Sequence, residues 1–99
     1  MKKSFNKKCY NVLRKVRKGK VVTYKDIARK LNSKGYRAVG NAMKRNKDII
    51  NIHCYKVIRS DGRVGGYSKG MKRKIQLLKK EGIEVKNGKI DLKKYKLRL

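Results

Sequence analysis

The chain has 99 residues, of which 32 are Lys or Arg and 6 are Asp or Glu, so its formal net charge is +26. This length fits one domain over residues 1–99, and no apolar run approaches the ~20 residues that cross a bilayer. The basic start lacks the apolar region of a signal peptide. Such a charge indicates a polyanionic partner, most simply nucleic acid; a lysine-rich solvated surface is the alternative. We expect a DNA-associated cytoplasmic monomer with no membrane segment.

The two cysteines, Cys9 and Cys54, are too few for a disulfide framework and fit a reducing compartment. Together with His53 they offer three soft metal ligands without Cys-x-x-Cys spacing. A structural zinc site needs four ligands. We therefore expect no metal ion in this protein.

Three helices are predicted in the first half of the chain. Apolar residues at helical spacing predict the first over Phe5–Arg17. Thr23 and Asp26 form a capping box that starts the second helix, and after a turn the third covers Tyr36–Arg45. Two short helices with a glycine-containing turn and a basic second helix predict a helix-turn-helix. The residues expected to face inward on the third helix are Ala38, Val39, Ala42 and Met43.

The second half begins with an apolar stretch over Ile49–Ile58, which predicts a mostly buried strand. Ser60–Arg63 has the composition of a hairpin turn, and Val64–Tyr67 is expected to return from it. Helices followed by such a hairpin are typical of a winged helix-turn-helix. We therefore predict a mainly α fold with small β hairpins.

A fourth helix is predicted from about Lys69 to Glu81, with Ser68 as its cap and Gly82 at its left-handed end. The tail over Ile83–Ile90 predicts a second small hairpin that turns at Asn87-Gly88. The residues expected to face inward on the fourth helix are Met71, Ile75, Leu77 and Leu78.

Cys54 is the first candidate for chemistry, because it lies among apolar residues beside Lys56 and directly after the single histidine, His53. A buried structural cysteine is the commoner outcome for such a residue. Two features favour reactivity: the strongly positive field favours the thiolate, and Gly65-Gly66 allows a ligand to approach closely. Both interpretations stay open on the residues alone.

A set of short motifs occurs in one order along the chain. The set consists of Thr23-Tyr24, Arg37-Ala38-Val39-Gly40, Asn46, Cys54 followed by Val57, Gly65-Gly66-Tyr67-Ser68, Lys74, Leu77-Leu78 and Glu81-Gly82. It resembles the C-terminal, DNA-binding and active-site domain of the O6-alkylguanine-DNA alkyltransferase family. The resemblance runs from about Phe5 to the C-terminus, and the family's usual N-terminal domain has no counterpart in this sequence.

The resemblance implies a role for each matching residue. Cys54 would accept an alkyl group from O6 of guanine in double-stranded DNA, in one irreversible step that needs no cofactor. Arg37 would fill the space of the extruded nucleotide, and Tyr24 would press on the target phosphate. Tyr67 and Ser68 would hydrogen-bond the leaving guanine. Further implied residues are Asn46 and Glu81 in a proton relay with the position of Tyr55, Met43, Val57, Gly65 and Lys74 around the substrate, and Ala38, Asn41, Lys44 and Arg45 on the DNA.

Simpler structural interpretations exist for several of these residues. Arg37 also suits an ordinary phosphate contact on a basic helix, and Tyr24 suits packing at the start of a helix. Asn46 suits a helix C-cap and Glu81 a helix-end residue. Tyr67 suits a core position in which its hydroxyl needs a partner.

The sequence departs from the family pattern around the nucleophile. The family has Pro-Cys-His-Arg-Val where this chain has His53-Cys54-Tyr55-Lys56-Val57. The family histidine takes the thiol proton through a water, whereas a tyrosine with a reference pKa of ~10 is a poor base at neutral pH. We therefore expect slower alkyl transfer. His53 would face away from Cys54 in a strand and could replace the base only if the backbone turns there.

Two other functions remain open from the sequence. One is a non-enzymatic, alkyltransferase-like protein that binds the lesion and recruits other repair factors; small size and the missing histidine favour it, and Cys54 argues against it. The other is a plain winged-helix regulator or nucleoid protein, which only the charge and the helix-turn-helix pattern favour.

Overall fold

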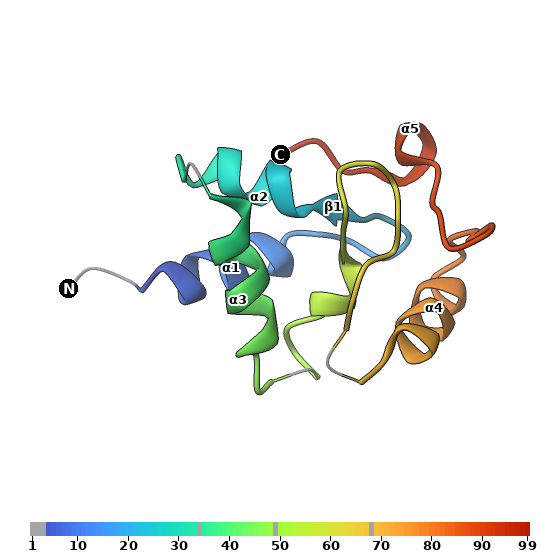
Figure 1. Cartoon of the computed structure of the whole chain (residues 1–99), viewed down its shortest axis with the longest axis horizontal. Helices are drawn as coiled ribbons and strands as arrows, with labels where there is room; N and C mark the ends of the chain where they lie inside the picture. Colours follow the sequence, from blue (N-terminus) through green and yellow to red (C-terminus); the bar gives the residue numbers. More distant parts are fainter. Residues whose placement is uncertain (1–3, 34, 49, 68) are drawn as a thin grey trace.

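The computed structural model describes residues 4–33, 35–48, 50–67 and 69–99. It is helix-rich, which confirms the predicted mainly α fold (Figure 1). No helix in these ranges is long and apolar enough to cross a membrane. The helices are α1 (Phe5–Arg14), α2 (Tyr24–Lys30), α3 (Tyr36–Lys44), α4 (Met71–Lys80) and α5 (Leu92–Tyr95), η1 (Cys54–Lys56) is a 3₁₀ turn, and the strands are β1 (Val22–Thr23) and β2 (Val57–Ile58).

The helix-turn-helix consists of α2 and α3, which pack against each other, while α1 packs against α3. The capping box forms as predicted, because the Asp26 amide donates to Thr23 Oγ1 at 3.0 Å. Helix α1 ends three residues before the predicted Arg17. Ala38 is exposed, so its predicted inward orientation is wrong, whereas Val39 on the same helix is fully buried.

The strand predicted over residues 49–58 is wrong for most of its length; Ile49 itself lies outside the described residues. Polar side chains before η1 bind nearby amides instead: Asn46 Oδ1 accepts from Asp48 at 3.0 Å, and Asp48 Oδ1 accepts from Asn51 at 3.2 Å. Such local bonds compete with a strand ladder. Only β2 is extended, and it pairs in parallel with β1, with Val22 opposite Val57 and Thr23 opposite Ile58.

The turn after β2 forms as predicted, with the Gly62 amide donating to Arg59 O at 2.9 Å. The Arg59 amide also donates across this turn to Arg63 O at 2.9 Å, but the return segment makes no bond with β2 itself. The amide of Val64 donates to Gly88 O at 2.9 Å, and Arg63 bridges antiparallel to Lys89. The predicted first hairpin is therefore wrong in its partner, which comes from the C-terminal segment.

The turn predicted at Asn87-Gly88 is confirmed. Lys86 and Lys89 exchange two backbone hydrogen bonds of 2.9 Å across it, and the two central residues have φ of 52° and 73°. Positive φ at both positions is what a tight two-residue hairpin turn requires. Helix α5 follows and was not predicted; its cap is Asp91, which accepts from the Lys93 amide.

Helix α4 starts later than predicted, because its N-cap is Gly70 with φ of 93°. The predicted cap, Ser68, lies outside the described residues. Gly82 has φ of 84° at the other end, as predicted. Met71 is 51% exposed, so its predicted inward orientation is wrong, and Lys74 is fully buried instead.

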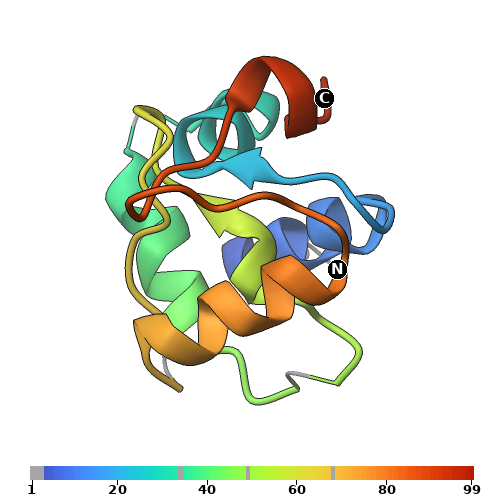
Figure 2. The same cartoon turned by 90° about the vertical axis from the view of Figure 1, so that its right-hand side faces the viewer.

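The segment from Cys54 to Ile58 lies between two apolar clusters and joins them. Cys54 and Val57 pack with residues of α1, α2 and α3. Tyr55 and Ile58 pack with Leu78 of α4 and with the C-terminal segment. Figure 2 shows α4 (orange) in front of this segment and α5 (red) above it. Because side chains of this short segment pack in both clusters, the position of the backbone around Cys54 is fixed by both.

Candidate active site and DNA-binding surface

Cys54 lies at a pocket of about 450 Å³ formed between α2, α3, η1 and the loop before α4. Its side chain is 5% exposed, and its amide donates to Ile52 O at 3.0 Å, which fixes the start of η1. The structure thus brings together with the cysteine six residues that the sequence analysis named in its motifs or as implied site residues. The pocket lining is Tyr24, Gly40, Met43, Lys44, Cys54, Gly66 and Tyr67.

The two tyrosines of this pocket come from turns that fix their positions. Tyr24 follows the cap Thr23 directly, and Tyr67 follows Gly65, whose φ of 77° favours glycine. Burial, and secondly the neighbouring Cys54, raise the pKa of both hydroxyls. Both side chains therefore stay protonated at neutral pH and can donate hydrogen bonds into the pocket.

Lys74 lies beneath the pocket and is fully buried. Its Nζ donates to Val57 O at 2.7 Å and to Gly66 O at 3.1 Å, and lies 6.0 Å from the centroid of the Tyr24 ring. Burial lowers the pKa of Lys74 from 10.5 to about 8, and the nearby Cys54 offsets part of this effect. The ammonium therefore ties β2 to the loop before α4 and places a positive charge close to the thiol.

Two predicted residues take part in this arrangement without lining the pocket. Val57 is fully buried and contributes its carbonyl to Lys74. Gly65 lines the neighbouring hollow, and a Cβ there would lie 3.3 Å from Arg59 Cγ and 3.9 Å from Lys74 Nζ. The space beside Gly65 is therefore occupied by protein side chains, whereas Gly66 has open space beside it and lines the Cys54 pocket.

Asn46 is buried and contacts the backbone that leads to Cys54. Its Nδ2 donates to Ile52 O at 2.8 Å, and its Oδ1 accepts from the Asp48 amide. Both ends of the side chain thus hold the 46–52 loop in shape. A part of Asn46 in a proton relay stays a prediction.

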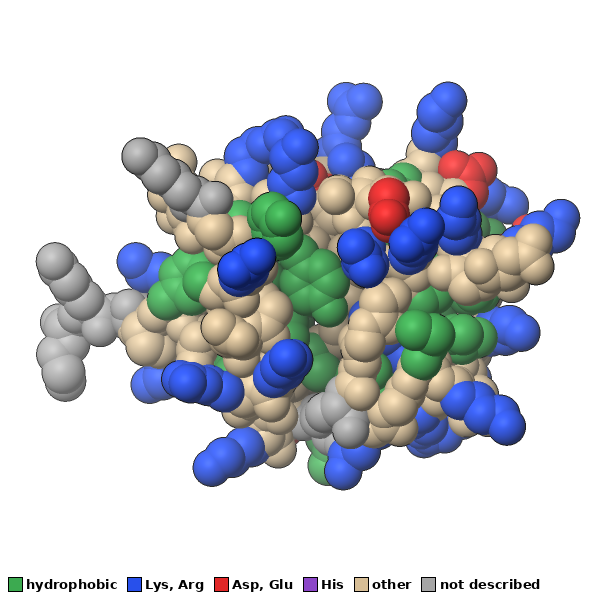
Figure 3. All heavy atoms as spheres, in the orientation of Figure 1, with side chains coloured by type: hydrophobic (Ala, Val, Ile, Leu, Met, Phe, Trp, Pro, Cys, Tyr) green, Lys and Arg blue, Asp and Glu red, His purple; other side chains and the backbone are tan. Residues whose placement is uncertain are grey.

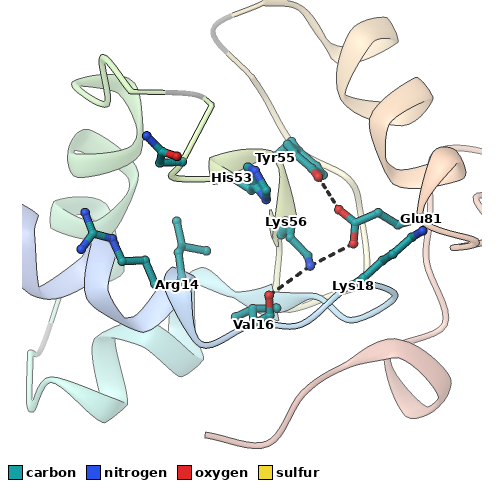
Figure 4. Close-up of a pocket in the computed structure, with 9 residues that line it drawn as sticks. Arg14, Val16, Lys18, His53, Tyr55, Lys56 and Glu81 are labelled. Carbon is teal, nitrogen blue, oxygen red and sulfur yellow. Dashed lines mark hydrogen bonds and ion pairs between the residues drawn. The ribbon is translucent and has the colours of Figure 1, made fainter.

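Tyr55 and Glu81 meet on the other side of η1, away from the Cys54 pocket (Figure 4). The Tyr55 hydroxyl donates to one carboxylate oxygen of Glu81. The other oxygen accepts from the Gly19 amide at 2.9 Å and pairs with Lys56 Nζ at 2.9 Å. The structure therefore brings the two predicted relay residues together, although they are 26 positions apart in the chain.

The protonation of this pair follows from its contacts. Burial and the hydrogen bond to Glu81 raise the pKa of the Tyr55 hydroxyl. Burial alone would raise the pKa of Glu81, but the hydrogen bonds from Tyr55, Lys56 and Gly19 lower it. At neutral pH Tyr55 is therefore a hydrogen-bond donor and Glu81 a carboxylate.

His53 is exposed and lies on the same side as Tyr55 and Glu81. Its Nε2 is 2.8 Å from Ile50 O, and its ring stacks on Tyr55 with 5.4 Å between the centroids. The histidine does not line the Cys54 pocket. In the described part of the chain, no three His, Cys, Asp or Glu side chains gather as they would around a metal ion.

A second hollow, of about 480 Å³, adjoins the Cys54 pocket and shares Tyr24, Gly40 and Gly66 with it. Arg37 lines this hollow, beside three residues that were not singled out from the sequence: Lys25, Tyr36 and Arg59. For Arg59 the available signal was its position directly after a buried strand. The predicted DNA-contacting residues of α3 are all exposed, and they are Arg37, Ala38, Asn41, Lys44 and Arg45.

On the face shown in Figure 3, the charge of the side chains suits a polyanionic partner. Figure 3 shows Lys and Arg side chains spread around it, with acidic side chains confined to its upper part.

The sequence profile described as "6-O-methylguanine DNA methyltransferase, DNA binding domain" matches residues 4–83. The chain belongs to this family. It therefore has the DNA-binding domain of a family of DNA-repair methyltransferases, with the helix-turn-helix fold that the sequence predicted.

Individual members of the methyltransferase family and solved structures are similar over most of the chain. A "Bifunctional methyltransferase/endonuclease" of Picrophilus torridus is 50% identical over 88 residues, which are 88% of this chain and 30% of that protein. The O6-methylguanine-DNA methyltransferase of Pyrococcus kodakaraensis is 45% identical with a TM-score of 0.74, over 82% of this chain and 47% of that one. S. pombe Atl1, solved with DNA containing O6-carboxymethylguanine, is 30% identical with a TM-score of 0.88 over 100% of both chains.

This chain spans about half the length of the methylated-DNA–protein-cysteine methyltransferases it matches, for example 52% of the Metallosphaera sedula protein and 45% of the Thermococcus kodakarensis protein. The activity of these longer relatives is therefore a proposal for this chain.

Proposed function

We propose that this protein repairs DNA by moving an alkyl group from O6 of guanine to Cys54, once per molecule. The observation that carries this proposal is the position of Cys54 at a pocket of about 450 Å³ between the helix-turn-helix and Tyr67, with the Lys74 ammonium beneath it. We take duplex DNA as the partner; it supports this choice that Atl1 and a Mycobacterium tuberculosis relative were solved in complex with DNA.

The first step is extrusion of the damaged nucleotide, because a base inside the duplex hides O6 from a protein nucleophile. Tyr24, at the border of the two hollows, presses on the phosphate of the target nucleotide. Arg37 enters the stack in place of the base, where its planar guanidinium offsets part of the unstacking cost of a few kcal/mol. The extruded guanine then lies in the pocket between Met43 and Tyr67.

The second step is displacement at the alkyl carbon. The thiol proton leaves to solvent, and Lys74 stabilises the thiolate that remains. A bond forms between Sγ of Cys54 and the carbon, the bond from the carbon to O6 breaks, and its electron pair stays on guanine. The Tyr67 hydroxyl donates a proton to the leaving guanine and regains one from water. The thioether product is stable, so the protein is not regenerated.

The test uses equimolar protein and a duplex with a single O6-methylguanine, followed by nucleoside analysis of the DNA. The proposal predicts one guanine restored per protein molecule and no further turnover. The Cys54→Ser variant should restore none, because a neutral hydroxyl is a far weaker nucleophile than a thiolate, while it still binds the duplex. Restoration by Cys54→Ser at the rate of the natural protein would refute the assigned nucleophile.

The role of Arg37 gives a separate prediction. Arg37→Ala should weaken binding to the lesion duplex about 30-fold, because ~2 kcal/mol of the unstacking cost is no longer offset. Binding is measured by fluorescence anisotropy with lesion and undamaged duplexes at several salt concentrations.

Two controls separate stacking by Arg37 from a plain phosphate contact. Arg37→Lys keeps the charge without the planar group and should remain weak on the lesion duplex. Arg45→Ala, on the same helix, should weaken both duplexes equally and flatten the salt dependence. Full recovery of lesion binding by Arg37→Lys would show that Arg37 only contacts a phosphate.

One observation favours a second function, a lesion-binding protein that transfers nothing. The Atl1 structure matches this chain over the full length of both, and Tyr55 stands where the transferase family has its base. Such a protein would bind the O6-methylguanine duplex more tightly than the undamaged duplex and leave the lesion intact. The nucleoside analysis above distinguishes the two functions.

A further inference from the structure

The C-terminal segment, residues 95–97, makes a strand-like contact with the residue that precedes β1. The Val21 amide donates to Tyr95 O at 2.9 Å, and the Leu97 amide donates to Val21 O at 2.8 Å. Lys96, between the two bonding residues, bridges in parallel to Val21. Figure 1 shows this part of the chain (red) running back from α5 toward α2. It lies beyond residue 83, where the match to the family profile ends.

The backbone that leads into Tyr24 is thereby held on two sides. Val21 bonds to the C-terminal segment, whereas Val22 and Thr23 pair with β2. Thr23 caps α2, and Tyr24 is the first residue of this helix. Tyr24 lines both the Cys54 pocket and the hollow beside it. Because only two residues separate Val21 from Tyr24, a displacement of the C-terminal segment also displaces the tyrosine.

A side chain of the C-terminal segment contacts the same turn of α2. Lys96 Nζ lies 3.3 Å from Asp26 Oδ2, and in the described part of the chain it is the one cation within ion-pair distance of Asp26. This carboxylate oxygen is buried and accepts no hydrogen bond from the described residues. The Asp26 amide donates to Thr23 Oγ1, so Asp26 belongs to the capped turn that begins with Tyr24. Loss of the ammonium leaves a buried carboxylate oxygen uncompensated, which favours a rearranged turn in which Asp26 reaches water.

We propose that Lys96 is a positioning residue for Tyr24, and that the C-terminal segment keeps the first turn of α2 in the arrangement that lesion binding uses. The second half of this proposal rests on the proposed role of Tyr24 at the target phosphate. Packing anchors the segment at both ends, since Leu97 lies against the apolar cluster that contains Cys54 and Tyr95 lies against the other cluster. Lys96 therefore extends from a fixed backbone to the turn that carries Tyr24.

Fluorine NMR of the full chain labelled with 3-fluorotyrosine tests the positioning in the free protein. The Tyr24 signal is assigned by its loss in Tyr24→Phe. Lys96→Met should shift or broaden this signal, whereas Lys96→Arg should leave it near its natural position because it keeps the charge. The Tyr10 signal, assigned in the same way, should not change, because the Tyr10 hydroxyl bonds to Ala42 O in another part of the fold. This reference separates a local displacement of Tyr24 from a general loosening.

Lys93→Met is the matched control, because it removes the same charge from an exposed position of the neighbouring helix α5. It should leave the Tyr24 signal unchanged. An unchanged Tyr24 signal in Lys96→Met, or the same change in Lys93→Met, would overturn the proposal.

A double-mutant cycle tests whether Lys96 acts through Asp26. Asp26→Asn removes the charge with little change of shape. In this background, Lys96→Met should change the free energy of unfolding by about half or less of its effect in the natural protein, because the two residues are in contact. Equal effects in the two backgrounds would overturn the assigned pair.

Binding to duplexes with and without O6-methylguanine tests the use of this arrangement. Lys96→Met should reduce the preference for the lesion about fivefold, the order expected from a partly exposed ion pair. Lys93→Met should weaken both duplexes equally. Equal loss of preference in both variants would overturn the proposal. A displaced Tyr24 signal with an unchanged preference would support the positioning by Lys96 and overturn the proposed role of Tyr24, so the two failures are distinguishable.

Discussion

Tyr55→His should raise the rate of alkyl transfer to Cys54 by about 100-fold, the contribution expected of a positioned general base. In the natural protein the Tyr55 hydroxyl stays protonated because its pKa is raised, and it donates a hydrogen bond to Glu81, so it cannot accept the thiol proton. An imidazole at this position titrates near neutral pH and remains next to the Glu81 carboxylate, which can orient it. Because residue 55 does not line the Cys54 pocket, the imidazole would take the thiol proton through a bridging water, as the family histidine does. The rate is measured by quenching stoichiometric reactions and quantifying methylated protein.

Tyr55→Phe is the control for this variant. It removes the hydroxyl but keeps the ring in the cluster with Ile58 and Leu78. Because the hydroxyl takes no proton in our account, the rate should stay within about twofold of the natural protein, while stability falls by ~1–3 kcal/mol because Glu81 loses a donor. A slower or unchanged rate for Tyr55→His, or a large loss of rate for Tyr55→Phe, would contradict the account.

Lys74→Met should slow the reaction of Cys54 with iodoacetamide about tenfold at neutral pH, because removal of the buried ammonium disfavours the thiolate. Cys9 does not compete in this assay: it is fully buried, and burial raises its pKa to about 11. Lys72→Met, an exposed position in the same helix, removes the same formal charge and should have little effect. Equal reactivity in both variants would show that Lys74 does not act on the thiol.

Lys74 also predicts a pH dependence of stability. Its pKa falls from 10.5 in the unfolded chain to about 8 in the folded protein. Between these values the unfolded chain binds a proton that the folded protein lacks, so the free energy of unfolding rises with pH, by up to ~3 kcal/mol in total. Below pH 8 both states are protonated and the full cost of burying the charge applies. Denaturant unfolding of the natural protein and of Lys74→Met across pH 7–10 measures how much more the free energy of unfolding rises with pH in the natural protein. This difference in rise should be smaller if Lys74 is less buried.

Local signals predicted much of the fold. The capping box at Thr23, the left-handed Gly82 and the Asn87-Gly88 turn each depend on residues close in sequence, and all three are present. The strand predicted over 49–58 is wrong because the side-chain oxygens of Asn46 and Asp48 accept hydrogen bonds from nearby backbone amides, which favour a turned chain before η1. Apolar composition alone does not contain that information.

Part of the candidate site was also predicted from the sequence, and part was not. The family resemblance implied that Tyr24, Met43 and Tyr67 surround the substrate at Cys54, and the structure brings them into one pocket. The burial of Lys74 was not predicted, because helical spacing assigns a lysine to the solvent face unless its carbonyl partners are known. The meeting of Tyr55 and Glu81 behind η1 also depends on a contact between distant segments, which spacing cannot reveal.

The central claim is that Cys54 takes the alkyl group, and the most direct measurement is the mass of the protein after reaction. The protein is mixed with a duplex that carries one O6-methylguanine, its intact mass is recorded, and its peptides are mapped. Our account predicts a gain equal to one methylene group, located on the peptide that contains Cys54 and absent from the peptide that contains Cys9. Tight and lesion-selective binding with an unchanged protein mass would contradict it and identify a damage-binding protein instead.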